Sequence, residues 1–370
     1  MWLGWALVIS TSAAVPHPLD CGVPERPPHP RGLQSRHTPS PPPGDKEVRN
    51  AYPSIPNVYE TANFAVWWGP TGGVTETQAA ALADAFEDSW TEQVEVQGYP
   101  HPLGADAYKF NVYIGDTGGG TPSAEGAAGY FYEDREGQPM VVIDHQLAQI
   151  PSSARLTAAH ELFHAVQEAT GSYGFSERAM WWHEATANWM VDQVYPDFAG
   201  NISTLYAIYT RPEFPLNYFT WSWSGLPEDE HAYAAQLFAT YLEENHGGVG
   251  LIYDTWMGVD GGDPIEVIDG LLMDVSIGEA HHEYAMKNAT WDYIHGDTLA
   301  WWAVDAESAY GADSHRVAGT LSSDELDIWQ DADEFAPQTY GAHYWQLDAD
   351  LPATMTAIVE TGDAESWWLG

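Results

Sequence analysis

Residues 157–167 read TAAHELFHAVQ, and residues 180–194 read MWWHEATANWMVDQV. His160 and His164 are four residues apart, so a helix places both imidazoles on one face, one turn from each other. Two imidazoles at this spacing can bind one Zn²⁺ ion at about 2.0–2.1 Å. Glu161 stands beside the first histidine, where its carboxylate can reach a water on the metal. The first stretch therefore predicts a metal-binding helix.

The second stretch supplies a candidate third ligand. The longer motif HExxHxxGxxH is absent, because Gln167 and Thr170 stand at its Gly and His positions. Residues 180–194 read as an amphipathic helix, and Glu184 lies near its start, twenty residues after the second histidine. Asn188 lies one turn later, and its side-chain oxygen can accept the outer ring N–H of a ligand histidine.

The neighbouring residues have other interpretations. The His pair alone could be a hydrogen-bonded polar patch, but Glu184 and Asn188 on a following helix favour a metal site. His183 lies about 100° round the helix from Glu184, so both cannot face one metal. Glu168 lies a further turn along the histidine face and is interpreted as an outer or surface group. We expect three tryptophans in the core: Trp181, Trp182 and Trp189.

HELFHAVQ followed by WWHEATANWMVDQVYPD resembles the gluzincin metallopeptidases, and most closely a group of secreted bacterial metallopeptidases of myxobacterial type. The resemblance covers roughly residues 55–300, including YKFNVYIGDTGG, MVVID and HAYAAQLFATYLEENHGG. It implies zinc-dependent peptide hydrolysis with Glu161 as base and three ligands: His160, His164 and Glu184. Many gluzincins carry an Asp one turn after the ligand Glu, where this chain has Asn188.

A zinc peptidase also needs a donor for the oxyanion besides the metal, usually a Tyr or His from a later helix. The candidates here are Tyr233, His231 and Tyr218, of which we choose Tyr233. A strand over residues 140–144 could pair through its edge with an extended peptide substrate.

The surrounding sequence predicts an α+β fold. We expect one helix over residues 76–96 with Thr75 as its N-cap, and mostly helical structure from 152 to about 300. Strands are expected over residues 62–68, 108–114, 129–132 and 140–144, with a turn at 134–138. Residues 51–300 would form a zincin-like catalytic domain, and residues 301–370 a small antiparallel β-domain, complete or truncated.

The N-terminal 50 residues differ in composition from the rest of the chain. Residues 1–14, MWLGWALVISTSAA, predict a signal peptide and a secreted protein, extracellular or periplasmic. Residues 15–50 are rich in proline, which predicts a linker or pro-segment. Cys21, in DCGVPE, resembles the PRCGxPD cysteine switch, with Asp20 and Glu25 replacing Arg and Asp. Its thiolate could fill the open position of zinc and autoinhibit the enzyme; a cysteine without a role is the alternative.

Composition limits the partners. Twelve Lys+Arg against 54 Asp+Glu give a net charge of −42, which repels nucleic acid phosphates and anionic lipids. No stretch predicts membrane insertion, and 44% apolar residues exclude a disordered acidic tail. The sequence therefore predicts a secreted Zn²⁺ metallopeptidase acting on proteins or peptides. The alternatives are a catalytically silent zincin-fold binding or adhesion protein, and a helical adhesin whose HExxH is accidental.

Overall fold

The computed structural model describes residues 46–124, 126–174, 176–196, 204–221 and 227–294, with Gly296, Leu299, residues 317–321, Ala342 and residues 344–347. The predicted signal peptide, the leader up to residue 45 with Cys21, and most of the predicted C-terminal β-domain lie outside the described residues.

Residues 46–50, which the sequence assigned to the leader, pair with the folded region. The backbone of Glu47 forms hydrogen bonds with the chain just before strand β3. The guanidinium of Arg49 forms ion pairs with Asp134 and Glu136 in the turn after strand β4. The packed part of the chain therefore begins at least five residues before the predicted boundary.

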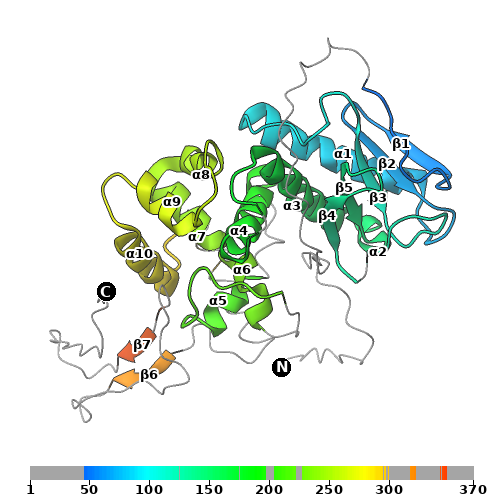
Figure 1. Ribbon diagram of the computed structural model, residues 1–370. Helices are drawn as coiled ribbons and strands as arrows, with labels where there is room; N and C mark the ends of the chain where they lie inside the picture. Colours follow the sequence, from blue (N-terminus) through cyan, green and yellow to red (C-terminus); the bar gives the residue numbers. More distant parts are fainter. Residues whose placement is uncertain are drawn as a thin grey trace, which may run out of the picture.

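The sheet has five strands in the order β1-β2-β3-β5-β4 (Figure 1). The three central strands, β2, β3 and β5, run parallel, and β1 and β4 pair antiparallel at the two edges. Four strands confirm the predicted segments, and β1 was missed because it is a short edge strand whose exposure alternates. The bounds are β1 (Asn57–Glu60), β2 (Phe64–Trp68), β3 (Phe110–Ile114), β4 (Gly129–Glu133) and β5 (Pro139–Ile143).

The expectation that residues 140–144 form an edge strand is wrong. Strand β5 lies between β3 and β4, so both of its sides are paired inside the sheet. The predicted turn at residues 134–138 explains this, because it folds β4 back along the outer side of β5. Strand β4 is therefore the outermost strand at this side of the sheet.

Helices α1, α3 and α4 follow the predicted segments. Helix α1 (Glu76–Trp90) begins with a capping box at Thr75 and continues as a π-helix over Thr91–Val96. Helix α3 (Pro151–Thr170) has proline in its first turn and ends at Gly171, whose φ of 69° is left-handed. A short α2 (His145–Ala148) precedes α3, and α4 (Glu177–Val194) follows it.

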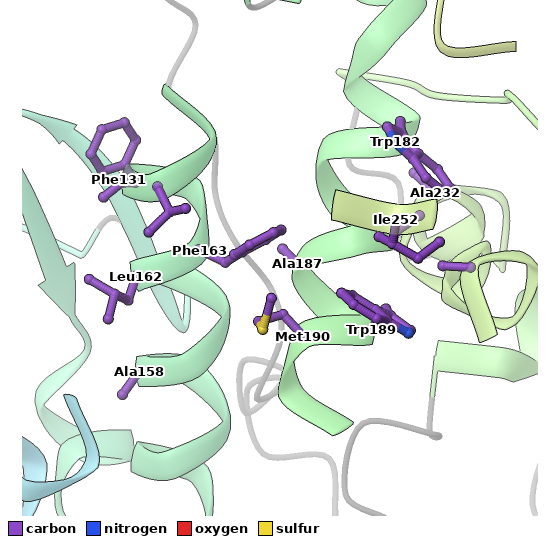
Figure 2. Packing of buried hydrophobic residues seen from close by; sticks show 14 of the residues in the cluster. Phe131, Ala158, Leu162, Phe163, Trp182, Ala187, Trp189, Met190, Ala232 and Ile252 are labelled. Carbon is purple, nitrogen blue, oxygen red and sulfur yellow. The ribbon is translucent and has the colours of Figure 1, made fainter. Parts of the chain in front are cut away.

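Helix α3 lies between the sheet and α4, so it is buried on all sides (Figure 1). Leu162 faces the sheet, near Phe131 of β4, whereas Phe163 points toward α4 (Figure 2). The three predicted core tryptophans of α4 are fully buried. Every residue from 157 to 167 is buried, so the polar side chains of the HExxH stretch must find their partners inside the protein.

The chain after α4 is helical as predicted, and the α+β fold is confirmed. The bounds of its α-helices are α5 (Tyr206–Thr210), α6 (His231–Ala234), α7 (Gln236–Leu242), α8 (Gly248–Trp256), α9 (Pro264–Leu271) and α10 (Ile277–Thr290). A 3₁₀ turn at Pro227–Glu230 precedes α6, and a π-helix at Glu243–Gly247 precedes α8. None of the helices among the described residues is long and apolar enough to cross a membrane.

Two strands are described in the predicted C-terminal β-domain, β6 (Val317–Leu321) and β7 (Tyr344–Leu347). They pair in parallel, so the antiparallel prediction is wrong for this pair. A hairpin joins antiparallel neighbours, whereas parallel neighbours need a connection of about a dozen residues or more. Residues 322–343 provide that length between β6 and β7.

Candidate metal centre

Helices α3 and α4 bring three donor atoms together. The Nε2 atoms of His160 and His164, one turn apart on α3, lie 3.0 Å from each other. Oε2 of Glu184, on α4, lies 3.2 Å from the first of these nitrogens and 3.4 Å from the second. We call these three atoms the donor triangle. Among the described residues, no other three His, Cys, Asp or Glu side chains meet in this way.

The dimensions of the triangle suit a single tetrahedral metal ion, and zinc can be tested against them. Bonds of about 2.0–2.1 Å to a tetrahedral Zn²⁺ separate neighbouring ligand atoms by roughly 3.3–3.4 Å. The sides of the triangle, 3.0, 3.2 and 3.4 Å, are close to that separation, so one ion can contact all three atoms. Two imidazole nitrogens and one carboxylate oxygen also form a ligand set typical of catalytic zinc. The residues present therefore fit the metal that the sequence predicts.

When no metal is bound, mutual attraction stabilises the triangle as an ion pair against the opposing effect of burial. Burial alone would lower the pKa of His164, but the carboxylate of Glu184, helped by Glu161, raises this pKa to about 9. Burial would raise the pKa of Glu184, but the two histidines lower it to about 2. These shifts favour a protonated His164 beside an ionised Glu184 when no metal is bound, so metal binding must release that proton.

The imidazole rings of His160 and His164 are each oriented by a side-chain amide at Nδ1, the ring nitrogen that faces away from the triangle. Nδ1 of His160 lies 2.8 Å from Oδ1 of Asn188, whose Nδ2 donates to the carbonyl of Tyr233. Nδ1 of His164 lies 2.7 Å from Oε1 of Gln167. An amide oxygen only accepts, so each Nδ1 carries a hydrogen. Once His164 has released its second proton to make way for a metal, each Nε2 can offer its lone pair to the triangle. The predicted contact of Asn188 with a ligand histidine is confirmed.

Glu161 lies beside the triangle without forming one of its corners. It follows His160 directly on α3, and both of its carboxylate oxygens are buried. Its charge raises the pKa of His164 after the larger effects of burial and Glu184, which places it within electrostatic reach of the donors. Glu168, one turn after His164 on α3, is half-buried and contributes no donor to the triangle.

The three candidate oxyanion donors have different surroundings. The ring of Tyr233, on α6, lies nearly parallel to that of His160, with centroids 6.0 Å apart. His231, two residues earlier, contacts the rings of Phe214 and Tyr218 instead. Burial, with a smaller contribution from the charge of nearby Arg211, lowers the pKa of His231 to about 3, so its ring is neutral. Tyr233 is thus the candidate that the structure places next to a ligand.

His183 is not a donor, as predicted. Its Nδ1 lies 3.2 Å from Oε1 of Gln167 and its Nε2 lies 3.1 Å from the carbonyl of Gly174. The role of Gln167 was not predicted from the sequence, where this residue stands only as a departure from a longer motif. The available signal was its spacing, because a residue three positions after His164 lies on the same helix face.

The chain was also compared with known proteins. The profile of a protein family described as a family of unknown function (DUF6055) matches residues 35–365. The chain belongs to DUF6055. No curated protein matches this DUF6055 member. The family match spans the donor triangle and both ligand helices but carries no statement about chemistry, so the function rests on the site itself.

Proposed function

We propose that this DUF6055 protein is a zinc metallopeptidase of the gluzincin type that hydrolyses peptide bonds in proteins or peptides. The observation that carries the proposal is the donor triangle, whose sides fit one tetrahedral ion, with the carboxylate of Glu161 on the adjoining residue. Zinc held by three protein ligands would polarise the scissile carbonyl and lower the pKa of a water toward neutrality.

The residues of the chain divide the remaining work. Glu161 takes the proton from the attacking water and passes it to the leaving amine, which makes it the base and then the acid. Asn188 and Gln167 keep the two ligand rings in the form that presents Nε2. The hydroxyl of Tyr233 would donate a hydrogen bond to the oxyanion, supported by the position of its ring beside His160.

Export is part of the proposal. The apolar run of residues 1–14 has the length of a signal peptide, and the Pro-rich segment after it suits a removable leader. The proposed location is extracellular or periplasmic, and the proposed inhibition through Cys21 depends on that leader. A Cys21→Ser variant should show no latency before leader removal; latency equal to that of the parent would contradict the switch.

Metal analysis combined with a casein assay tests the enzyme proposal. The protein as secreted by the expressing cells should contain about one zinc per chain, and Glu161→Gln should keep the zinc while hydrolysis falls roughly 10²–10⁴-fold. Glu177→Gln, an exposed acid in the first turn of α4, is the matched control and should change neither quantity.

Three results would be decisive against parts of the proposal. Parent protein without zinc would overturn the metal centre. Bound zinc with undiminished activity in Glu161→Gln would overturn the mechanism. Bound zinc without hydrolysis of casein or gelatin by the parent would favour the catalytically silent binding protein instead.

A further inference from the structure

We propose that Gln167 is a positioning residue that fixes His164 as a metal donor and ties the two ligand helices together. The inference builds on the proposed zinc site, but its main contacts are made between groups of the protein itself. The side chain of Gln167 is 2% exposed, and both ends of its amide are engaged by groups of helices α3 and α4.

The orientation of the amide follows from partners whose polarity is fixed. Nε2 of Gln167 lies 2.9 Å from the backbone carbonyl of His183, which can only accept a hydrogen bond. It lies 3.0 Å from Oγ1 of Thr186, whose own hydrogen is donated to the carbonyl of Trp182. Both partners therefore require a donor, so the NH₂ group must face α4 and the oxygen must face α3.

This orientation decides which nitrogen of His164 is available. Oε1 of Gln167 lies 2.7 Å from Nδ1 of His164 and 3.2 Å from Nδ1 of His183, so His164 is its closer partner. Because the oxygen accepts, Nδ1 of His164 carries a hydrogen and Nε2 is directed to the donor triangle. A reversed amide would place NH₂ against that ring and favour the wrong tautomer.

The same amide couples the ligands of different helices. It is bonded to His164 on α3 and to the residues directly before and shortly after Glu184 on α4. The α4 side of this contact is held in turn by α8, because the ring of His183 packs on Trp256 with centroids 4.8 Å apart. Gln167 therefore fixes the distance between the histidine pair and the carboxylate. This distance determines whether one metal ion can contact all three donor atoms.

The test replaces Gln167 with an apolar side chain of similar length. Gln167→Met should lower zinc affinity of the full chain about 10–100-fold in competition with a chromophoric chelator, as loss of a ligand's outer hydrogen bond does. The matched control is Gln93→Met, which removes another buried amide bonded to α3, through the carbonyl of Ala159. That control should retain the affinity of the parent.

A spectroscopic measurement separates positioning from general stability. In ¹⁵N-histidine-labelled metal-free protein, the Nδ1–H of His164 should give a protected proton signal, assigned by its loss in His164→Gln. The signal should disappear or shift in Gln167→Met and persist in Gln93→Met.

The outcomes are distinguishable. A Gln167→Met variant with parental zinc affinity and an unchanged signal overturns the inference while leaving the zinc proposal intact. If the parent binds no zinc but Gln167→Met loses the signal, the zinc proposal fails and the positioning of His164 by Gln167 stands. If Gln167→Met does not fold, Thr186→Val removes one anchor of the amide and should weaken the same signal; an unchanged signal in that variant also overturns the inference.

Discussion

The donor triangle and helix α6 both place buried polar groups at the centre of the molecule, but they do so by different means. The triangle is built from residues 24 positions apart on two consecutive helices, and its shortest side is set by one turn of α3. Helix α6 joins it from 45 positions further along, through the hydrogen bond from Asn188 to the carbonyl of Tyr233. Local geometry thus sets the relative positions of the two histidines, whereas tertiary packing sets the positions of Glu184 and of α6.

The kind of contact differs as well. The ligands act through their side chains, so each substitution removes a donor atom. Tyr233 supports Asn188 through its backbone carbonyl, which a change of side chain leaves in place. We therefore expect substitutions in the triangle to change metal affinity, and substitutions of α6 side chains to change the rate alone.

Glu184→Gln should produce the largest effect. It keeps the size of the side chain but removes the only anionic donor of the triangle and the main partner that raises the pKa of His164. Zinc affinity should fall by roughly a thousand-fold, about 4 kcal/mol, because a neutral amide is a poor zinc ligand. Chelator competition measures the change, with Glu177→Gln as control. Parental affinity in Glu184→Gln would remove this residue from the ligand set.

The difference between local helix geometry and tertiary packing explains which features could be predicted from the sequence. The i, i+4 spacing of His160 and His164 fixes their relation in any helix, and Glu184 followed as the acid of the next helix. Four strands of the sheet and α1 follow from apolar patterning and from the cap at Thr75, whereas β1 does not. The interior position of β5 was not predicted, because strand order depends on how hairpins and crossovers fold in space. The spacing of Gln167 from His164 was visible in the sequence, but the acceptors that orient its amide come from another helix, which the sequence does not show.

Tyr233→Phe tests α6 directly. If the phenol donates to the oxyanion, its removal should lower kcat roughly 10²–10³-fold, which is the usual effect of losing one such donor. Zinc affinity should stay at the parental value, because the carbonyl that accepts from Asn188 is unchanged. Casein hydrolysis and chelator competition on the same samples give both quantities.

The control for Tyr233 is Tyr218→Phe, which changes a hydroxyl of the neighbouring cluster around His231 rather than one beside a ligand ring. It should keep the parental kcat. A larger loss in Tyr218→Phe than in Tyr233→Phe would reverse our choice of donor. A fall of zinc affinity in Tyr233→Phe would contradict the division between triangle and α6.

The pH dependence of the metal-free protein reports on the triangle as an ion pair. The pKa of His164 is raised from 6.5 to about 9, so its stabilisation is complete below pH 6.5 and is lost as the pH rises through 9. The pKa of Glu184 is lowered from 4.5 to about 2, so its stabilisation is present above pH 4.5 and is lost as the pH falls through 2. Stability should be greatest between pH 4.5 and 6.5.

Urea unfolding of the metal-free chain measures this profile. Between pH 6.5 and 9 the free energy of unfolding should decrease by about 2–3 kcal/mol, in line with the shift of the His164 pKa. The decrease should be clearly smaller in Glu184→Gln, because the partner that contributes most to raising the pKa is gone while Glu161 remains. A parent whose stability rises over that interval would show that the pair is not protonated as the structure indicates.

The smallest predicted effect is that of salt on stability, which distinguishes the buried charges of the triangle from the surface charges. A net charge of −42 makes the surface repel itself, and added salt screens exposed charges much more than buried ones. The Tm of the metal-free parent should therefore rise by a few degrees between 0.05 and 1 M NaCl, roughly the effect of 1 kcal/mol. Glu184→Gln should rise in parallel, because salt screens buried charges little and Glu184 is only 1% exposed. Stability that falls on adding salt would contradict self-repulsion, and a gap between parent and variant that closes in salt would show that the triangle is open to solvent.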